Sequence, residues 1–385
     1  MPRSQIISAS ITDGTIVNTD VADSTLTTTK LATPNLGRRN LVINGAMQVA
    51  QRGTNFTGLG GTSGVYTIDR YRFGFTMNNG RLTITQSTDT PNGFGNSLKA
   101  DITTAESSLN SASASAISQF FEGQDVQQFK KGTSDAEQYT LSFHVKSNVT
   151  GTYIVELFDQ DNTRQVSKSY TIDSANTWEK KTLTFPADTT GAFDNDNAHS
   201  LSVQWFLASG TDRASGTLNT SWASSTNANR AVGQANLFSS TDNEWYITGV
   251  QLEVANEATP FEHRSFGEEL TLCSRYFFVL AKGSDLTNEN VGNAFGHSSS
   301  QMECVVRYGP GSGMRVAPTL DHPSGTNYYE VLNDSENAQF NSLQYYNPTK
   351  RSALIYRNSI GVTANGNYRF VLNNASAHIY FDAEL

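Results

Sequence analysis

The chain has 385 residues, of which 37% are hydrophobic and 16% charged, and its formal net charge is −9; this length gives room for two or three domains with proper cores. The acidic balance argues against a nucleic-acid partner, since binding a phosphate backbone needs clustered Lys and Arg. The longest apolar run, Tyr276 to Ala281, is too short to cross a bilayer, so no membrane insertion is expected. Two cysteines, Cys273 and Cys304, exclude a disulfide framework, and we expect both thiols to be reduced and buried.

Residues 1–37 carry a repeat. Six aliphatic residues recur at five-residue intervals, and most residues between them are Ser, Thr, Asp, Asn, Gly or Ala. A period of five matches neither a helix nor a flat strand; it is typical of a fibrous β structure, whose repeats bury their apolar face only by stacking on neighbours. Two further copies of the chain are the simplest partners, so we expect a homotrimeric stalk, although composition alone also allows a disordered leader. The expected axis residues are Ile6, Ile11, Ile16, Val21, Leu26 and Leu31.

Residues 38–264 are a series of short alternating runs separated by turn residues. Many short strands without convincing helices between them predict a sandwich or barrel, and two packed antiparallel sheets of jelly-roll type fit the length. The clearest runs are Tyr139–Val145, Thr152–Phe158, Lys181–Phe185, Leu201–Leu207 and Glu244–Glu253.

Residues 265–385 begin with a pattern that predicts a helix, and the rest of this range again has the short alternating runs typical of β-strands. Ser265 followed three residues later by Glu268 is a capping-box pattern, so a short helix is expected to start here and lead into the apolar run Cys273 to Leu280. The final run, residues 375–385, is strand-like. A second β-rich module is therefore expected over residues 265–385.

Several motifs resemble those of bacteriophage tail fibres and related virion appendages, especially of marine phages. The stretch Asn40–Gly53 with Tyr66–Arg72 is similar to the opening of their central jelly roll, and Ile247–Glu253 with Ala258–Arg264 is similar to its close. The five-residue repeat looks like their short stalk. Stretches similar to their distal module are Cys273–Phe277, Met314–Thr319 and Asp382–Glu384.

The middle of the chain also resembles jelly-roll carbohydrate-binding modules, through Phe120–Gly123, Tyr139–Phe143 and Asn176–Phe185. This resemblance implies a sugar-binding fold and, as is common in such modules, a structural calcium ion. Glu253 could contribute to such a site, but the sequence has no dense Asp cluster. We therefore expect no metal and no cofactor.

The sequence holds little that points to catalysis. It has no HExxH motif, zinc-spaced Cys and His set, Walker loop or Gly-x-Ser-x-Gly elbow. The acidic pairs Asp159/Asp161 and Asp194/Asp196 could in principle serve glycoside hydrolysis, which uses two carboxylates, but both lie in polar, turn-like surroundings typical of solvated loop acids. No catalytic residue is assigned, and an enzyme is not expected.

Aromatic residues are the candidates for recognition. Trp222 lies in a polar stretch without alternation, where it could stack on a sugar ring or fold back as a lid. Nine of the fifteen tyrosines lie beyond residue 270, and Tyr is a favoured residue of adaptable recognition loops. The candidate glycan-binding residues are Trp222, Tyr328, Tyr329, Tyr345 and Tyr346.

Together these observations predict a homotrimeric phage tail fibre or spike. Residues 1–37 would bind a tail or capsid adaptor protein, residues 38–264 would form the jelly roll, and residues 265–385 would contact a host surface glycan by non-covalent binding. No secretory signal is expected at the start of the chain, so we expect assembly onto a virion in the host cytoplasm.

Three alternatives stay open. A capsid fibre or decoration protein of the same build would carry the same sequence features. A polysaccharide depolymerase and a cellular glycan-binding module are the others.

Overall fold

The computed structural model describes residues 38–285, 288–309, 311 and 313–385. The chain divides into two units, Met1–Arg39 and Asn40–Leu385, and every element named below belongs to the second. The six residues expected on the stalk axis lie outside the described residues, so the trimeric stalk stays a prediction. The boundaries expected near residues 37 and 264 stay predictions as well.

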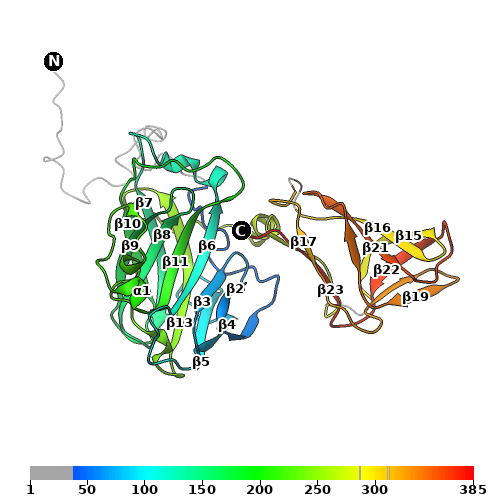
Figure 1. Cartoon of the computed structure of the whole chain (residues 1–385), viewed down its shortest axis with the longest axis horizontal. Helices are drawn as coiled ribbons and strands as arrows, with labels where there is room; N and C mark the ends of the chain where they lie inside the picture. The colour runs from blue at the N-terminus through cyan, green and yellow to red at the C-terminus, as the bar shows by residue number, and fades with distance from the viewer. Residues whose placement is uncertain (1–37, 286–287, 310, 312) are drawn as a thin grey trace, which may run out of the picture. The chain divides into compact units, whose positions relative to one another are not determined.

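Residues 55–254 form two antiparallel sheets (Figure 1). The six-stranded sheet has the order β1 (Asn55–Leu59), β4 (Arg81–Ser87), β5 (Ser97–Thr104), β13 (Glu244–Val254), β7 (Tyr139–Ser147) and β10 (Glu179–Phe185). The seven-stranded sheet has the order β12 (Ala223–Ser224), β9 (Arg164–Ile172), β8 (Gly151–Asp159), β11 (His199–Ser209), β6 (Ala114–Glu122), β3 (Arg72–Thr76) and β2 (Thr62–Tyr66). The mostly β, jelly-roll-like sandwich expected from the alternating runs is confirmed.

One hydrophobic core joins the two sheets of the sandwich. Trp205 on β11 and Phe143 on β7 are fully buried and meet edge to face, with ring centroids 5.9 Å apart. The pleat of each strand turns alternate residues inward. Each large aromatic side chain buried there removes about 150–250 Å² of surface from water. The residues between them on β6, β8 and β11 face the opposite side, and this outer face carries the site described below.

Residues 277–382 form two further antiparallel sheets with a core of their own. The three-stranded sheet has the order β14 (Phe277–Lys282), β23 (His378–Asp382) and β17 (Thr319–Asp321). The seven-stranded one has the order β19 (Asn337–Phe340), β18 (Tyr329–Leu332), β22 (Asn367–Leu372), β15 (Asn290–Ser298), β16 (Gln301–Arg307), β21 (Ser352–Asn358) and β20 (Gln344–Tyr346). Within the described ranges, no strand of this part pairs with a strand of the sandwich.

Helices are few and short. Helix α2 (Phe266–Ser274) starts where the capping-box pattern predicts, because the Ser265 side chain accepts a hydrogen bond from the Glu268 backbone N–H at 3.3 Å. The remaining helical turns are α1 (Thr211–Ala214), η4 (Gly123–Asp125), η5 (Gln127–Phe129), η6 (Asn227–Asn229) and η7 (Leu237–Ser239). None of the described helices is long and apolar enough to span a bilayer. Cys273 and Cys304 are free and buried, as expected.

A network of largely buried ion pairs joins the sandwich to residues 382–384. The guanidinium of Arg70, whose side chain is 1% exposed, pairs with Glu384 and lies 3.4 Å from the centre of the Tyr276 ring. Arg52 pairs with both Asp382, at 3.1 Å, and Glu384, at 3.3 Å. These four charged residues, Arg52, Arg70, Asp382 and Glu384, are called the C-terminal ion-pair network below. The sandwich and residues 382–384 are therefore connected by side-chain ion pairs and not by strand pairing.

Candidate functional site

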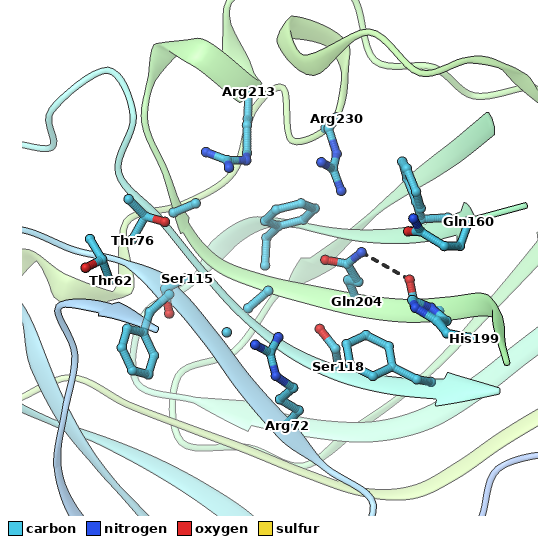
Figure 2. A pocket seen from close by; sticks show the side chains of 18 residues that line it. Thr62, Arg72, Thr76, Ser115, Ser118, Gln160, His199, Gln204, Arg213 and Arg230 are labelled. Carbon is cyan, nitrogen blue, oxygen red and sulfur yellow. Dashed lines mark hydrogen bonds between the residues drawn. The ribbon is translucent and has the colours of Figure 1, made fainter. Parts of the chain in front are cut away.

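A groove of about 540 Å³ lies on the outer face of the seven-stranded sheet of the sandwich (Figure 2). Its lining comes from β2, β3, β6, β8 and β11, with Arg213 from α1 and Arg230 from the segment after η6 at one side. The volume falls within the range of about 300–1,000 Å³ that is usual for ligand sites. This groove is the candidate functional site.

A row of polar side chains crosses the face that carries the groove. The strand register places Glu156 opposite Gln204, Gln204 opposite Ser118, and Ser118 opposite Arg72. Residues directly opposite on adjacent strands share a face, so four strands supply one continuous row. The residues that follow or precede them in sequence lie in the core, namely Phe73, Ile117, Val155 and Trp205.

The neighbouring row is apolar, and its members on β3 and β6 are small, which keeps this part of the groove open. Gly74 lies opposite Ala116, and Ala116 lies opposite Phe206. A Cβ atom added at Gly74 would meet its nearest neighbour, the Arg72 Nη1 atom, at 3.4 Å, which is ordinary contact. Gly74 therefore leaves space in the groove that a larger side chain could fill without moving the backbone.

Arginine is the charged residue of the groove. Arg72, Arg213 and Arg230 line it, and none of its lining residues is Asp or Glu. Arg230 binds the buried Glu156 carboxylate in a two-pronged geometry, with Nε 2.9 Å from Oε1 and Nη2 2.5 Å from Oε2. Burial raises the pKa of Glu156 even though Arg230 lies beside it. The charge of Arg230 is thus paired with the buried carboxylate of Glu156.

The other two arginines have fewer partners. Among the described residues, the Arg72 guanidinium makes no hydrogen bond or ion pair; it lies 5.7 Å from the centre of the Phe120 ring. Arg213 donates from Nη1 to the Ala112 carbonyl at 3.2 Å. Burial and the positive charge of Arg230 lower the pKa of Arg213. Both guanidiniums therefore retain N–H groups able to bind an acceptor.

Two buried polar atoms of the lining have no hydrogen-bond partner in the structure. They are the Ser115 Oγ atom and the His199 Nε2 atom. The His199 ring lies 4.5 Å from the Phe120 ring, and burial lowers its pKa from 6.5 to about 4. Since buried polar atoms are normally paired, a neutral His199 offers unused hydrogen-bonding capacity at the groove. Ser115 lies opposite the core residue Phe75, so its hydroxyl is on the core side of β6.

The structure places Trp222 away from this groove. Its Nε1 donates to the Pro186 carbonyl at 3.0 Å, and its ring meets the Tyr139 ring edge on, with centroids 6.2 Å apart. The side chain is half-buried against the sandwich core. This is the folded-back arrangement weighed for a loop tryptophan, and a sugar contact by Trp222 stays a prediction.

Three of the four doublet tyrosines lie in strands, which corrects the expectation that they lie in loops, and Tyr328 lies in the turn segment just before β18. Tyr329 begins β18 and is fully buried, while Tyr345 and Tyr346 belong to β20. Tyr328 and Tyr345 pack at the edge of the same core, and Tyr346 is 56% exposed. The Asn-, Ser- and Pro-rich surroundings are short turns between short strands, and alternation along a strand turns neighbouring residues to opposite faces. Of the four, Tyr346 offers the largest free surface.

The acidic candidates are engaged within the fold. Asp159 is fully buried, with its Oδ2 2.6 Å from the Lys131 ammonium, so it is not the solvated loop acid that the sequence indicated. Asp161 accepts from the Asp194 backbone N–H at 3.0 Å, and Asp196 accepts from the Ala198 N–H at 2.8 Å.

Glu253, the residue weighed as a calcium ligand, is satisfied by protein donors. Its carboxylate accepts from the backbone and hydroxyl of Thr259, at 2.9 and 2.7 Å, and from the Gln251 amide at 2.8 Å. In the part of the chain that the structure describes, no group of three or more His, Cys, Asp or Glu side chains is arranged to hold a metal ion.

The groove residues were missed by sequence reasoning. A signal for them exists in Leu201–Leu207, where Ser202, Gln204 and Phe206 occupy the face opposite to the core residues. Phe206 is an apolar residue on that outer face. An aromatic residue on the polar side of an alternating strand indicates that other residues pack on that face or that a ligand binds there.

No protein-family model matches this sequence, and no curated protein matches it. Among solved structures, the chain is similar to the enzymatically active domain of bacteriophage CBA120 tailspike protein 4, at 16% identity over 56% of this chain and 21% of that chain, with a TM-score of 0.30. It is also similar to the family 11 carbohydrate-binding module of Clostridium thermocellum in complex with a β-1,3-1,4-mixed-linked tetrasaccharide, at 12% identity over 54% of this chain and 99% of that chain (TM-score 0.28). A third is TmCBM61 in complex with β-1,4-galactotriose, at 9% identity over 56% and 97% of the two chains (TM-score 0.27).

The match covers about a fifth of the tailspike chain. At TM-scores of 0.27 to 0.30 these similarities carry no argument about the site, which rests on the geometry of the groove.

Proposed function

We propose that this chain is a virion appendage protein that attaches a phage particle to a host surface glycan, and that the groove of the sandwich binds the glycan without cleaving it. The observation that carries the proposal is the groove itself, an open site where a row of polar side chains crosses a sheet beside the half-buried rings of Phe120 and Phe158. The motifs that resemble phage tail fibres support the setting on a virion.

The chemistry of the lining suits a sugar. Ser118, Gln204 and Arg72 provide hydrogen-bonding groups in one row, and a pyranose presents hydroxyl groups around its edge. The rings of Phe120 and Phe158 provide flat apolar surface that can pack on the C–H face of a sugar. A few placed polar groups on an apolar, aromatic wall are the usual composition of a small-ligand site.

Binding without cleavage is proposed because the lining has no acidic side chain. Glycoside hydrolysis ordinarily uses a pair of carboxylates that flank the scissile bond. Glu156 is the member of the row on β8, but it is buried and held by Arg230. Incubation with a bound polysaccharide is expected to release no new reducing ends.

The groove replaces the distal module as the preferred contact with the host. Of the tyrosines expected to bind there, Tyr329 is fully buried and Tyr345 donates its hydroxyl to the Pro318 carbonyl at 2.9 Å. A side chain in the core offers no surface to a ligand. The distal module then serves other contacts of the particle, with Tyr346 as its accessible aromatic residue.

The remaining parts of the proposal concern assembly. Residues 1–37 would hold three copies together and bind a tail or capsid adaptor, with the protein located on the virion. Three grooves on one particle would raise weak sugar affinities through effective concentration. Labelling the protein on intact particles would distinguish a tail position from a capsid position.

The test fills the groove. Gly74→Phe adds a ring in the open space beside Arg72, whereas Gly95→Phe adds the same ring at an exposed glycine whose Cβ meets nothing within 4 Å. Full-length protein would be applied to host cells and to a microarray of bacterial surface glycans. We expect wild type and Gly95→Phe to bind alike and Gly74→Phe to bind at least about tenfold more weakly, a loss of about 1.4 kcal/mol, with an unchanged melting temperature. Equal binding by the folded Gly74→Phe variant would refute the groove as the site.

A further inference from the structure

The groove carries a charge opposite to that of the chain. The protein has 36 acidic and 27 basic residues, yet the groove is lined by three arginines and no acid. Figure 2 shows Arg213 and Arg230 along one side of the groove and Arg72 on the other. A positive site on an acidic protein is not a consequence of average composition.

The carboxylate beneath the groove does not cancel this charge. Glu156 accepts three N–H contacts from Arg230 within 3.2 Å, so its charge is balanced by one arginine. Asp212 and Glu156 attract Arg213, and Asp161 attracts His199, but none of these acids lines the groove. Arg72 and Arg213 remain as positive charges facing it.

Positive charges in and beside the groove also disfavour one another. Burial and the neighbouring charge of Arg230 disfavour the charged form of Arg213, and lower its pKa. The charges of Arg72 and Arg70 disfavour protonation of His199. A bound anion would relieve both interactions, whereas a neutral ligand would desolvate the guanidiniums without replacing their lost water.

We propose that the glycan bound in this groove is acidic, and that Arg72 and Arg213 bind its carboxylate, sulfate or phosphate substituents. This inference rests on the proposed function of the groove as a glycan site. The planar guanidinium fork matches the oxygens of all three groups and binds them more strongly than it binds a neutral hydroxyl. Gln204 and Ser118 then contact the uncharged part of the sugar.

The experiment compares polymers that differ only in charge. Binding of the full-length chain would be measured by calorimetry with polygalacturonate and its methyl ester, and with dextran sulfate and dextran. The first pair tests carboxylates and the second tests sulfates. We expect the charged member of at least one pair to bind tenfold or more tightly than its neutral partner, with affinity that falls as salt is raised.

The variants identify the arginines. Arg72→Gln and Arg213→Gln should each weaken acidic binding on the order of tenfold, and the double variant should weaken it further. Arg307→Gln removes an equal charge at an exposed position on β16, outside the groove, and should leave binding unchanged. Arg230 is left intact because its removal would strand the buried Glu156.

The outcomes separate this inference from the function beneath it. Equal affinity for charged and neutral polymers, no binding to any acidic polymer, or binding insensitive to Arg72→Gln and Arg213→Gln would each overturn the acidic ligand. If Gly74→Phe still abolishes cell binding in those cases, the groove remains the glycan site. If Gly74→Phe binds cells as wild type does, the site itself is wrong.

Discussion

Lys131→Met is expected to destabilise the sandwich more than any surface lysine substitution. The Lys131 ammonium is fully buried and held by four oxygens, with Asp159 Oδ2 at 2.6 Å, Asp188 Oδ2 at 3.1 Å, and the carbonyls of Thr190 and Gly191 at 2.9 and 2.6 Å. Methionine keeps most of the volume of the side chain but removes its charge. The two buried carboxylates then lose a shared cation.

The expected loss of stability depends on which hydrogen-bond donors each carboxylate retains. Asp188 retains Arg164, at 2.8 and 2.9 Å, so its charge stays paired. Asp159, with a side chain 0% exposed, retains only neutral donors from Asn162. Breaking a buried pair by removal of one partner costs about 3–5 kcal/mol. We expect a loss in that range for the free energy of unfolding of the sandwich.

Tryptophan fluorescence makes the assay specific to the sandwich. All four tryptophans of the chain lie between residues 178 and 245, and the Trp222 ring is 5.2 Å from the Lys131 ammonium. Urea unfolding followed by this signal reports on the sandwich and not on strands β14 to β23. The midpoint and slope then give the change in stability.

The adjacent lysine provides the control. Lys130 is 52% exposed and pairs with Glu137, which is 40% exposed, and such exposed pairs contribute little to stability because solvent screens them. Lys130→Met should therefore change little. The double variant Lys131→Met with Asp159→Asn should recover part of the loss, because it removes the stranded charge. A loss below about 1 kcal/mol for Lys131→Met would refute the reasoning.

Three further predictions concern acid, the C-terminal network and assembly. Burial lowers the pKa of His199 to about 4, so the unfolded chain binds a proton more readily than the folded one and stability is lost as the pH falls from 6.5 to 4. His199→Gln should reduce this loss by at most about 3 kcal/mol, measured by urea unfolding at the two pH values. The same loss of stability in the variant and the wild type would contradict this prediction. Glu384→Gln leaves the 1% exposed Arg70 without its buried partner carboxylate and should cost about 3–5 kcal/mol by the same assay. Glu257→Gln, at a residue that forms no ion pair with the described residues, should be neutral. Light scattering should give three chains per particle, and Ile16→Asp should fray the stalk, since burying an unpaired charge is costly; a monomer with residues 1–33 intact would refute the trimer.

The sandwich could be predicted because its signal is local. Alternation within Tyr139–Val145 and Leu201–Leu207 identifies strands with one buried face, and β7 and β11 contain these runs. The cap at Ser265 is local as well, since donor and acceptor lie three residues apart.

The groove could not be predicted because its signal is not local. Arg72, Ser118, Glu156 and Gln204 come from four strands that are far apart in sequence. Alternation shows that each faces away from the core, but it does not say which strands are neighbours or in what register. The expectation that the tyrosine doublets lie in loops was wrong for Tyr329, Tyr345 and Tyr346 for a related reason, since the pairing of β18 and β20 with distant strands is not visible in the sequence.

The C-terminal ion-pair network sets an order of events for a chain made on the ribosome. Arg70 and Glu384 are 314 residues apart, so every strand of the sandwich is synthesised long before the carboxylate that neutralises Arg70. A nascent sandwich must either keep this guanidinium hydrated or bury it unpaired, and the second is costly. Final consolidation of the sandwich around β3 should therefore wait until Glu384 has been synthesised, and a product that stops near residue 264 should be easier for cellular proteases to open than the same strands in the longer chain.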